Sequence, residues 1–183
     1  MIVTCSKSTG ALRQLDVAID LLFMDVDPLA IRTLAGAAHG VLADLVEQKS
    51  PGASWRSHLI EDSGLTFKAG MAILNSVQNY LKHADRDPDA ALSFDEEEND
   101  HILFIATLEC CALEHPMSLP MQAFQIWYLA SYPEKIGRST EVVQKSEWAF
   151  PDFNVLTRQE RLARGAEFLS VSRNEKEENR DAD

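Results

Sequence analysis

The sequence predicts an all-α fold, a single-domain bundle of six or more helices that pack mostly antiparallel to their neighbours. Apolar residues recur at spacings of three and four residues over most of the chain, as on one face of a helix. No stretch of four or more residues alternates apolar with polar, as a half-buried strand does. Short loops between capped segments favour antiparallel neighbours. With 183 residues, 45% of them hydrophobic, the chain can bury one core, and we expect one domain over residues 1–172.

The first two helices have clear boundaries. The spacing of apolar residues predicts a helix over residues 9–24. The next helix begins at Pro28, where the missing N–H costs nothing, directly after the capping residue Asp27. It is expected to end at about Lys49, because Ser50-Pro51-Gly52 breaks the helical pattern.

The middle of the chain is expected to contain two more helices and a loop. Ser54 can cap a third helix, which Asp62-Ser63-Gly64 interrupts. A broad apolar stripe then predicts a fourth helix over residues 65–83. Pro88 disfavours helical backbone at the residue before it, so residues 84–89 should form a loop.

A fifth helix is expected to be a core element, and a sixth helix follows it. The acidic residues 95–98 complement a helix N-terminus and predict the start of the fifth helix, which should end before Pro116. Ser118 can cap the sixth helix, and Tyr132-Pro133 should end it.

Shorter helices are expected over residues 140–147 and 157–170. The last eleven residues, 173–183, contain no apolar residue except Ala182. Such a segment cannot bury enough apolar surface to order itself, so a disordered acidic tail is predicted.

Charge, cysteine content and the lack of a signal-peptide pattern indicate which partners and which cellular compartment to expect. The chain has 17 basic and 29 acidic residues, a formal net charge of −12, which works against binding to DNA or to anionic membranes. The sequence shows no signal-peptide pattern and no run of 18 apolar residues. Its three cysteines, Cys5, Cys110 and Cys111, form no CxxC motif, which argues against a disulfide framework or a zinc ribbon. We expect a soluble, cytoplasmic protein without a cofactor.

Polar residues gather on one face near the end of the fourth predicted helix. Asn75, Asn79 and His83 are spaced four residues apart and therefore share a face. An imidazole exchanges protons at neutral pH, and amides can hold a phosphate or a base edge. This combination suits RNA cleavage through activation of a 2′-hydroxyl. In such a ribonuclease the catalytic residues would be His83, Asn79 and Lys82, and the substrate-binding residues would be Asn75, Gln78 and Arg86.

The segment Asn79-Tyr80-Leu81-Lys82-His83, at the end of a helix in an all-α bundle, resembles the signature of HEPN domains. That signature is an arginine, a spacer of four to six residues and then a histidine, often with a polar residue just after the arginine. The resemblance implies a helical fold and, in active members, a metal-independent ribonuclease site that two protomers form from their histidines and arginines. Other members bind nucleotides, neutralise toxins or have structural roles.

In this comparison His83 takes the place of the catalytic histidine and Asn79 that of the polar neighbour, whereas Gln78 occupies the arginine position. A neutral amide cannot supply the charge that stabilises a pentacovalent phosphate. The resemblance therefore favours a HEPN-like binding or regulatory module, and it leaves open whether the protein is an enzyme. Arg86 and Arg32 are arginines that could take over this role.

A second pair, Arg32 and His39, fits the same loose pattern with six residues between them. Helical spacing of seven places both on one face of the second predicted helix. His39 lies in the small and apolar run from Ala35 to Val41, where a histidine is more often a core residue bonded to a neighbouring carbonyl. We therefore expect His39 to be buried rather than catalytic.

The acidic loop after His83 has a second chemical interpretation. Four acidic residues stand at the ligand positions one, three, five and twelve of an EF-hand-like loop that could bind calcium: Asp85, Asp87, Asp89 and Glu96. Position six, which needs glycine for its sharp turn, is Ala90, and Pro88 stiffens the loop. The alternative is a solvated acidic loop that caps the fifth helix.

The charge of this region favours a protein partner over RNA. Residues 85–100 contain eight acidic residues and one basic residue, a net charge of −7. This charge would repel RNA from His83 and attract a basic protein surface. We therefore expect a HEPN-like binding module that forms a homodimer or binds a protein partner with a basic surface. RNA cleavage through His83 in a toxin or defence system, and calcium-dependent regulation, remain alternatives.

Overall fold

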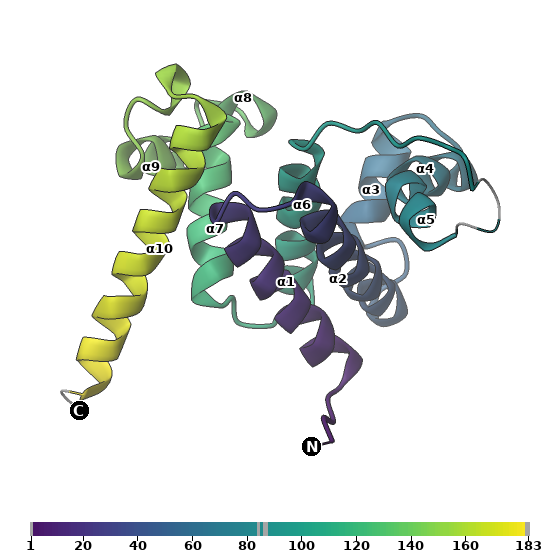
Figure 1. Cartoon of the computed structure of the whole chain (residues 1–183), viewed down its shortest axis with the longest axis horizontal. Helices are drawn as coiled ribbons and strands as arrows, with labels where there is room; N and C mark the ends of the chain where they lie inside the picture. Colours follow the sequence, from purple (N-terminus) through teal and green to yellow (C-terminus); the bar gives the residue numbers. More distant parts are fainter. Residues whose placement is uncertain (1, 84, 86–87, 182–183) are drawn as a thin grey trace. The chain divides into compact units, whose positions relative to one another are not determined.

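The chain folds into helices, three of which begin at the predicted capping residues. In the computed structural model, which describes residues 2–83, 85 and 88–181, all regular structure is helical, so the all-α fold is confirmed (Figure 1). The three capping side chains named in the sequence accept backbone N–H groups at the starts of α2, α3 and α7. These bonds join Asp27 Oδ1 to Leu29 N at 2.8 Å, Ser54 Oγ to Ser57 N at 3.1 Å and Ser118 Oγ to Met121 N at 3.3 Å.

The described residues form ten α-helices and one 3₁₀ helix: α1 (Lys7–Phe23), α2 (Pro28–Lys49), α3 (Trp55–Asp62), α4 (Phe67–Leu74), α5 (Ser76–Lys82), α6 (Glu98–Ala112), α7 (Leu119–Ser131), α8 (Pro133–Ile136), α9 (Glu141–Ala149), η1 (Phe153–Val155) and α10 (Arg158–Asp181). They belong to two compact units. The N-terminal unit contains the residues up to Ala18 and Asp27–Pro116, and the C-terminal unit contains Ile19–Val26 and the residues from Met117 onward. That both units form the one domain expected over residues 1–172 stays a prediction.

The fourth predicted helix is in fact two helices, α4 and α5, so the prediction of one continuous helix over residues 65–83 is wrong. Asn75 lies between them with φ −95° and ψ 2°. Ser76 Oγ donates to the carbonyl oxygen of Ile73 at 2.8 Å, a local hydrogen bond of the kind that competes with regular helix. The apolar stripe in the sequence runs across this break and does not reveal it.

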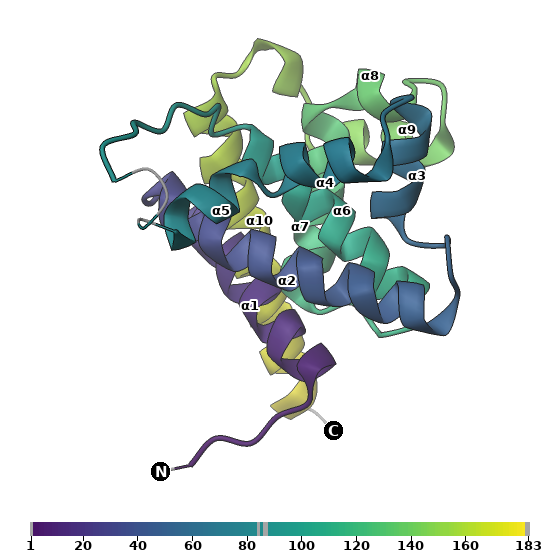
Figure 2. The same cartoon turned by 90° about the vertical axis from the view of Figure 1, so that its right-hand side faces the viewer.

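The N-terminal unit is organised around α2. This helix packs mainly against α6 and also against α5, while α3 contacts both α4 and α6 (Figure 2). The interior contains apolar side chains such as Leu42 and Leu103. It also contains a set of buried polar side chains: Arg32, His39, Arg56, Gln78, Asn99, Asp100, Thr107 and Glu109. Burial of a polar group is unfavourable unless the group is paired. The contacts of these side chains therefore matter both for stability and for function.

The helix α2 is also the one described helix whose length and composition would let it cross a membrane. In its apolar window 44% of the residues are buried inside the protein. Arg32 and His39 are among the buried residues of this helix. A core helix meets the same criteria, so the length and composition of α2 are weak evidence for a membrane span.

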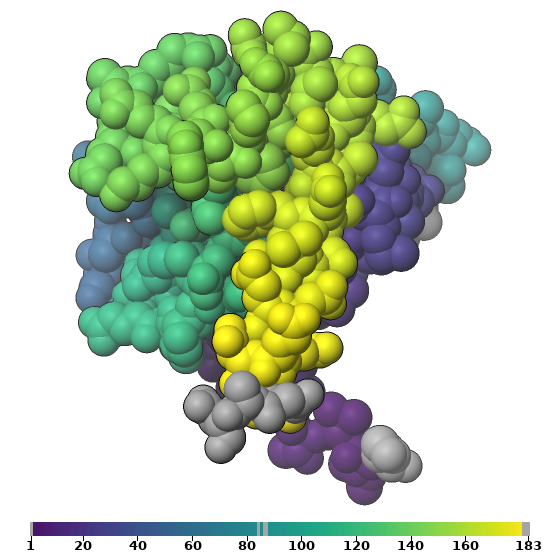
Figure 3. Space-filling view, turned by 90° about the vertical axis from the view of Figure 1, so that its left-hand side faces the viewer, coloured from purple at the N-terminus to yellow at the C-terminus, as the bar shows by residue number. Residues whose placement is uncertain are grey.

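The C-terminal unit is built around α7, which packs against α9 and α10; Figure 3 shows α10 (yellow) lying along its surface. The core of this unit is aromatic. Trp127 is fully buried and stacks on Phe124 with ring centroids 5.8 Å apart, and Phe23 meets the indole edge-on at 5.7 Å. Trp127 Nε1 donates to the carbonyl oxygen of Arg161 at 2.7 Å and so ties α7 to α10.

The helix α10 continues to Asp181, so residues 173–181 are helical where the sequence predicts the start of a disordered tail. Glu, Lys and Arg are good helix formers, and a composition-based argument for disorder ignores their ability to extend an existing helix. An ion pair also holds the start of this segment, because Arg173 Nη2 lies 2.7 and 2.9 Å from the two carboxylate oxygens of Asp20. Residues 182 and 183 lie outside the described residues.

Candidate binding pocket at His83

A pocket of about 430 Å³ lies in the N-terminal unit between α5 and the segment that leads into α6. Its lining combines hydroxyl, amide, imidazole, aromatic and carboxylate groups: Ser76, Val77, Asn79, Tyr80, His83, Ala91, Leu92, Ser93, Phe94 and Glu98. The hydroxyl group of Tyr80 donates to the carbonyl oxygen of Ala90 at 2.7 Å. This bond holds the segment before α6 against α5 and so forms one side of the pocket.

Asn79 and His83 line the same pocket, as their spacing of four residues predicts. Asn79 lies on α5, and His83 follows its last residue as the C-cap. The imidazole Nδ1 of His83 lies 3.9 Å from Oδ1 of Asp85. Both side chains are exposed, at 40% and 80%, so solvent screens this pair, and it is an ion pair only when the imidazole is protonated.

Three of the other predicted ribonuclease residues, Lys82, Asn75 and Gln78, are not part of the pocket lining. Lys82 is exposed on α5, and Asn75 is half-buried between α4 and α5. Arg86 lies outside the described residues. Of the six residues predicted for catalysis and substrate binding, the structure therefore brings two, Asn79 and His83, together in one cavity.

Gln78 faces α2 and is buried at 7% exposure. Its amide Nε2 forms a long hydrogen bond of 3.5 Å to the carbonyl oxygen of Thr33. Its Oε1 occupies the space beside Gly36 that a larger side chain would need. We therefore correct its role from substrate contact to a packing residue that joins α5 to α2.

Arg32 lies directly behind the pocket wall. Its Nη2 is 3.6 Å from Oε2 of Glu98, and its guanidinium carbon is 5.9 Å from the ring centroid of Phe94. Glu98 and Phe94 both line the pocket, but Arg32 is only 3% exposed. Burial lowers the pKa of Arg32 from its ordinary value, and the charge of Glu98 opposes this change. Among the described residues, Nε and Nη1 of Arg32 have no hydrogen-bond partner.

His39 is a core residue at 6% exposure, as predicted, and it does not line the pocket. Burial lowers its pKa to about 4, and the positive charges of Arg56 and Arg32 act in the same direction. The imidazole is therefore neutral at neutral pH. Its Nε2 is buried and has no hydrogen-bond partner among the described residues, so the predicted bond to a carbonyl is not formed by this atom.

A buried carboxylate of α6 contacts the first turn of α3. Glu109 of α6 is fully buried, and its Oε1 accepts the backbone N–H of Arg56 at 3.0 Å. Burial raises the pKa of Glu109, whereas the N–H group and the charge of Arg56 oppose this change. Arg56 in turn donates to Asp44 Oδ1 at 2.8 Å. Sequence reasoning could not find this contact, because 53 residues separate its two partners.

The acidic loop shows no assembled calcium site in the part that the structure describes. Asp85 and Asp89 are exposed, as is Glu96. Asp87 lies outside the described residues. Among the described residues no group of three or more His, Cys, Asp or Glu side chains is placed to hold a metal ion. The calcium interpretation therefore stays a prediction without structural support.

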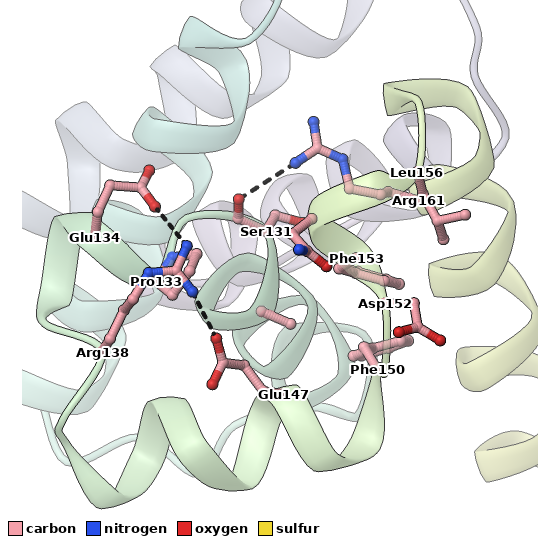
Figure 4. Close-up of a pocket in the computed structure, with 12 residues that line it drawn as sticks. Ser131, Pro133, Glu134, Arg138, Glu147, Phe150, Asp152, Phe153, Leu156 and Arg161 are labelled. Carbon is pink, nitrogen blue, oxygen red and sulfur yellow. Dashed lines mark hydrogen bonds and ion pairs between the residues drawn. The ribbon is translucent and has the colours of Figure 1, made fainter.

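A second polar pocket, of about 470 Å³, lies within the C-terminal unit (Figure 4). Its arginines already have partners in the protein. Arg138 lies 3.0 Å from Glu147 Oε1 and 3.9 Å from Glu134 Oε2. Arg161 Nη1 donates to the carbonyl oxygen of Ser131 at 3.2 Å. Sequence reasoning missed this pocket, whose lining residues are spread from residue 130 to residue 161 without a local motif.

The described residues thus form an all-α fold with a small cavity at His83, which is lined by polar and aromatic side chains and by the carboxylate of Glu98. Comparison with known proteins adds nothing to this description, since no family model, curated protein or solved structure matches the chain.

Proposed function

We propose that the protein is a binding module whose His83 pocket takes an arginine or lysine side chain from a basic protein partner. This proposal rests on the side chains that line the pocket. They offer the carboxylate of Glu98, the rings of Tyr80 and Phe94, and the amide of Asn79. A carboxylate pairs with a cation, and an aromatic ring attracts one over its face.

The surroundings of the pocket support a cationic ligand. Residues 85–100 carry a net charge of −7, and no lysine or arginine is among the described residues that line the pocket. Arg32 already contacts Glu98 from behind, but an ionised carboxylate has two oxygens and can accept from a second donor. An incoming basic side chain can therefore bind Glu98 without displacing Arg32.

The same facts favour binding over phosphate chemistry. Phosphoryl transfer needs a positive group directed at the reacting phosphate. Gln78 faces α2, and Arg32 is buried and already engaged by Glu98. The acidic residues around the pocket also raise the electrostatic cost of bringing RNA close to His83.

Titration with a fluorescein-labelled peptide of alternating arginine and serine tests the proposal by polarisation. We expect saturable binding to the full chain that weakens about 10-fold in Glu98→Gln, because a charge-assisted hydrogen bond is lost. Glu61→Gln, which removes a charge that is also exposed but lies on α3, is the control for net charge. Since Glu98 also contacts Arg32, Phe94→Leu provides a second variant that removes the ring and keeps the ion pair. Equal affinity for the wild type and all three variants would disprove the role of this pocket.

Metal-independent RNA cleavage is the second candidate, because Asn79 and His83 do share one cavity. Incubation of the purified protein with single-stranded RNA in EDTA distinguishes the two functions. Cleavage that disappears in His83→Ala would favour the ribonuclease, whereas our proposal expects no cleavage that depends on His83. Membership of the HEPN family and a homodimeric state remain predictions from the sequence.

A further inference from the structure

An apolar groove of about 700 Å³ lies in the C-terminal unit between α7 and α9. Each helix contributes one stripe of side chains to it. Gln122, Ile126 and Leu129 come from α7, and Val142, Lys145 and Ala149 come from α9. These residues are three and four positions apart, so they share one face of each helix. The two stripes form the kind of open face that a further helix fills in a bundle.

Trp148 lies at this groove and is 87% exposed. Val142, on the same helix, is 53% exposed. An indole is one of the largest apolar groups in proteins, and leaving it in water forgoes a large favourable burial term. An apolar groove with an exposed tryptophan at its edge is a typical protein-interaction surface.

We propose that a second copy of this chain covers the groove, in a two-fold dimer in which Trp148 of each copy lies in the groove of the other. The projecting indole and the hollow that could receive it belong to the same surface. A surface that carries both parts is complementary to itself, which is the requirement for a two-fold interface. The helices α7 and α9 of both copies would then pack as a four-helix arrangement.

The charge of the groove supports a second copy as its occupant. Two molecules with a net charge of −12 repel each other, so they associate most easily through a face with little charge. Among the described residues that line the groove, Lys145 is the one with a charged side chain, and its Nζ lies 2.6 Å from Oε1 of Glu141. The described residues that line the groove include no carboxylate, so the basic partner inferred for the His83 pocket finds no acidic group in this lining. This proposal is therefore independent of that function.

Light scattering after size exclusion tests the dimer on the full chain. We expect a dimer for the wild type at micromolar concentration and at least a 10-fold higher dissociation constant for Trp148→Ala, as for a tryptophan at the centre of an interface. Trp55→Ala is the matched control, because Trp55 is also exposed, at 42%, but lies on α3 in the N-terminal unit. A monomer at all concentrations up to about 100 μM would overturn the proposal, as would equal dissociation constants for the two variants.

Tryptophan fluorescence in the Trp55→Ala variant gives a second readout. The remaining indoles are Trp127, which is fully buried, and Trp148. Dimerisation through the groove should shift the emission to shorter wavelength as the protein concentration rises, because Trp148 leaves water. A doubled mass without this shift would show that another surface forms the dimer and would refute the proposal. Since Trp148 is nearly fully exposed in the single chain, its replacement should leave the melting temperature unchanged at concentrations below the dissociation constant and should lower it where the wild type is dimeric.

Discussion

The buried His39 makes stability depend on pH. Its pKa is lowered to about 4 in the folded protein, whereas an unfolded histidine titrates near 6.5. Below about pH 6.5 the unfolded chain takes up a proton that the native state does not accept until about pH 4. The stability associated with neutral His39 is therefore complete above pH 6.5 and is lost as the pH falls to about 4.

We predict that, because of His39, the free energy of unfolding falls by roughly 3 kcal/mol as the pH is lowered from 6.5 to 4. Urea unfolding at several pH values, followed by circular dichroism, measures this change. In His39→Gln the slope over this range should become flatter, because the titrating group is gone. His58→Gln removes an exposed histidine on α3 and serves as the control. Parallel pH profiles for the wild type and His39→Gln would contradict the prediction.

At the scale of elements, close helix packing in the C-terminal unit depends on Gly165. A Cβ atom at this position of α10 would overlap the ring of Phe23, which is buried. By contrast, Gly40 of α2 has open space where a Cβ would be. Replacement of these two helix-interior glycines by alanine is therefore expected to change the free energy of unfolding in opposite directions.

Gly165→Ala should lower the free energy of unfolding by about 1–3 kcal/mol, because overpacking forces a ring or a helix to move. Gly40→Ala should raise it by about 0.5–1 kcal/mol, since alanine has the higher helix propensity and meets no clash. Denaturant unfolding of the two variants beside the wild type is sufficient. A stabilised Gly165→Ala would show that α10 does not pack this closely against Phe23.

The sequence predicts well those helices whose ends are set by contacts between residues that are close in the sequence. Asp27, Ser54 and Ser118 bond to N–H groups two or three residues away, so α2, α3 and α7 begin where expected. The break at Asn75 was missed because apolar residues continue at helical spacing on both sides of it. The helix α8 has only four residues, too few for a periodic pattern.

The candidate site also contains residues whose placement could be predicted from the sequence and residues whose placement could not. Asn79 and His83 come from adjacent turns, so their shared cavity could be predicted. The direction of Gln78 and the position of Arg32 could not, because both depend on packing between helices that lie far apart in the sequence. Ile126 and Leu129 of the groove belong to the apolar residues of the sixth predicted helix, and periodicity alone does not distinguish a covered stripe from an open one.

At the scale of the whole molecule, the net charge of −12 gives the two proposed interactions opposite responses to salt. Binding of a basic peptide joins opposite charges, and salt screens this attraction. Association of two copies joins like charges, and salt screens this repulsion.

Raising the NaCl concentration from about 50 to about 300 mM should therefore weaken peptide binding several-fold and strengthen dimerisation. On the same protein stock, fluorescence polarisation measures the affinity for the peptide and light scattering measures the affinity of the dimer. If the two affinities change in the same direction, at least one of the two surfaces has been assigned to the wrong partner.

The position of Gln78 limits what protein engineering could achieve at this site. Its side chain ends against the backbone of α2 at Gly36 and Thr33, in a space that has no room for a longer group. A gain-of-function design that installs Gln78→Arg would direct the guanidinium into the helix interface, where it would loosen α5 without reaching His83. That single exchange would therefore not place a positive group in the His83 pocket, and an arginine donated by another molecule would have to enter from the solvent side.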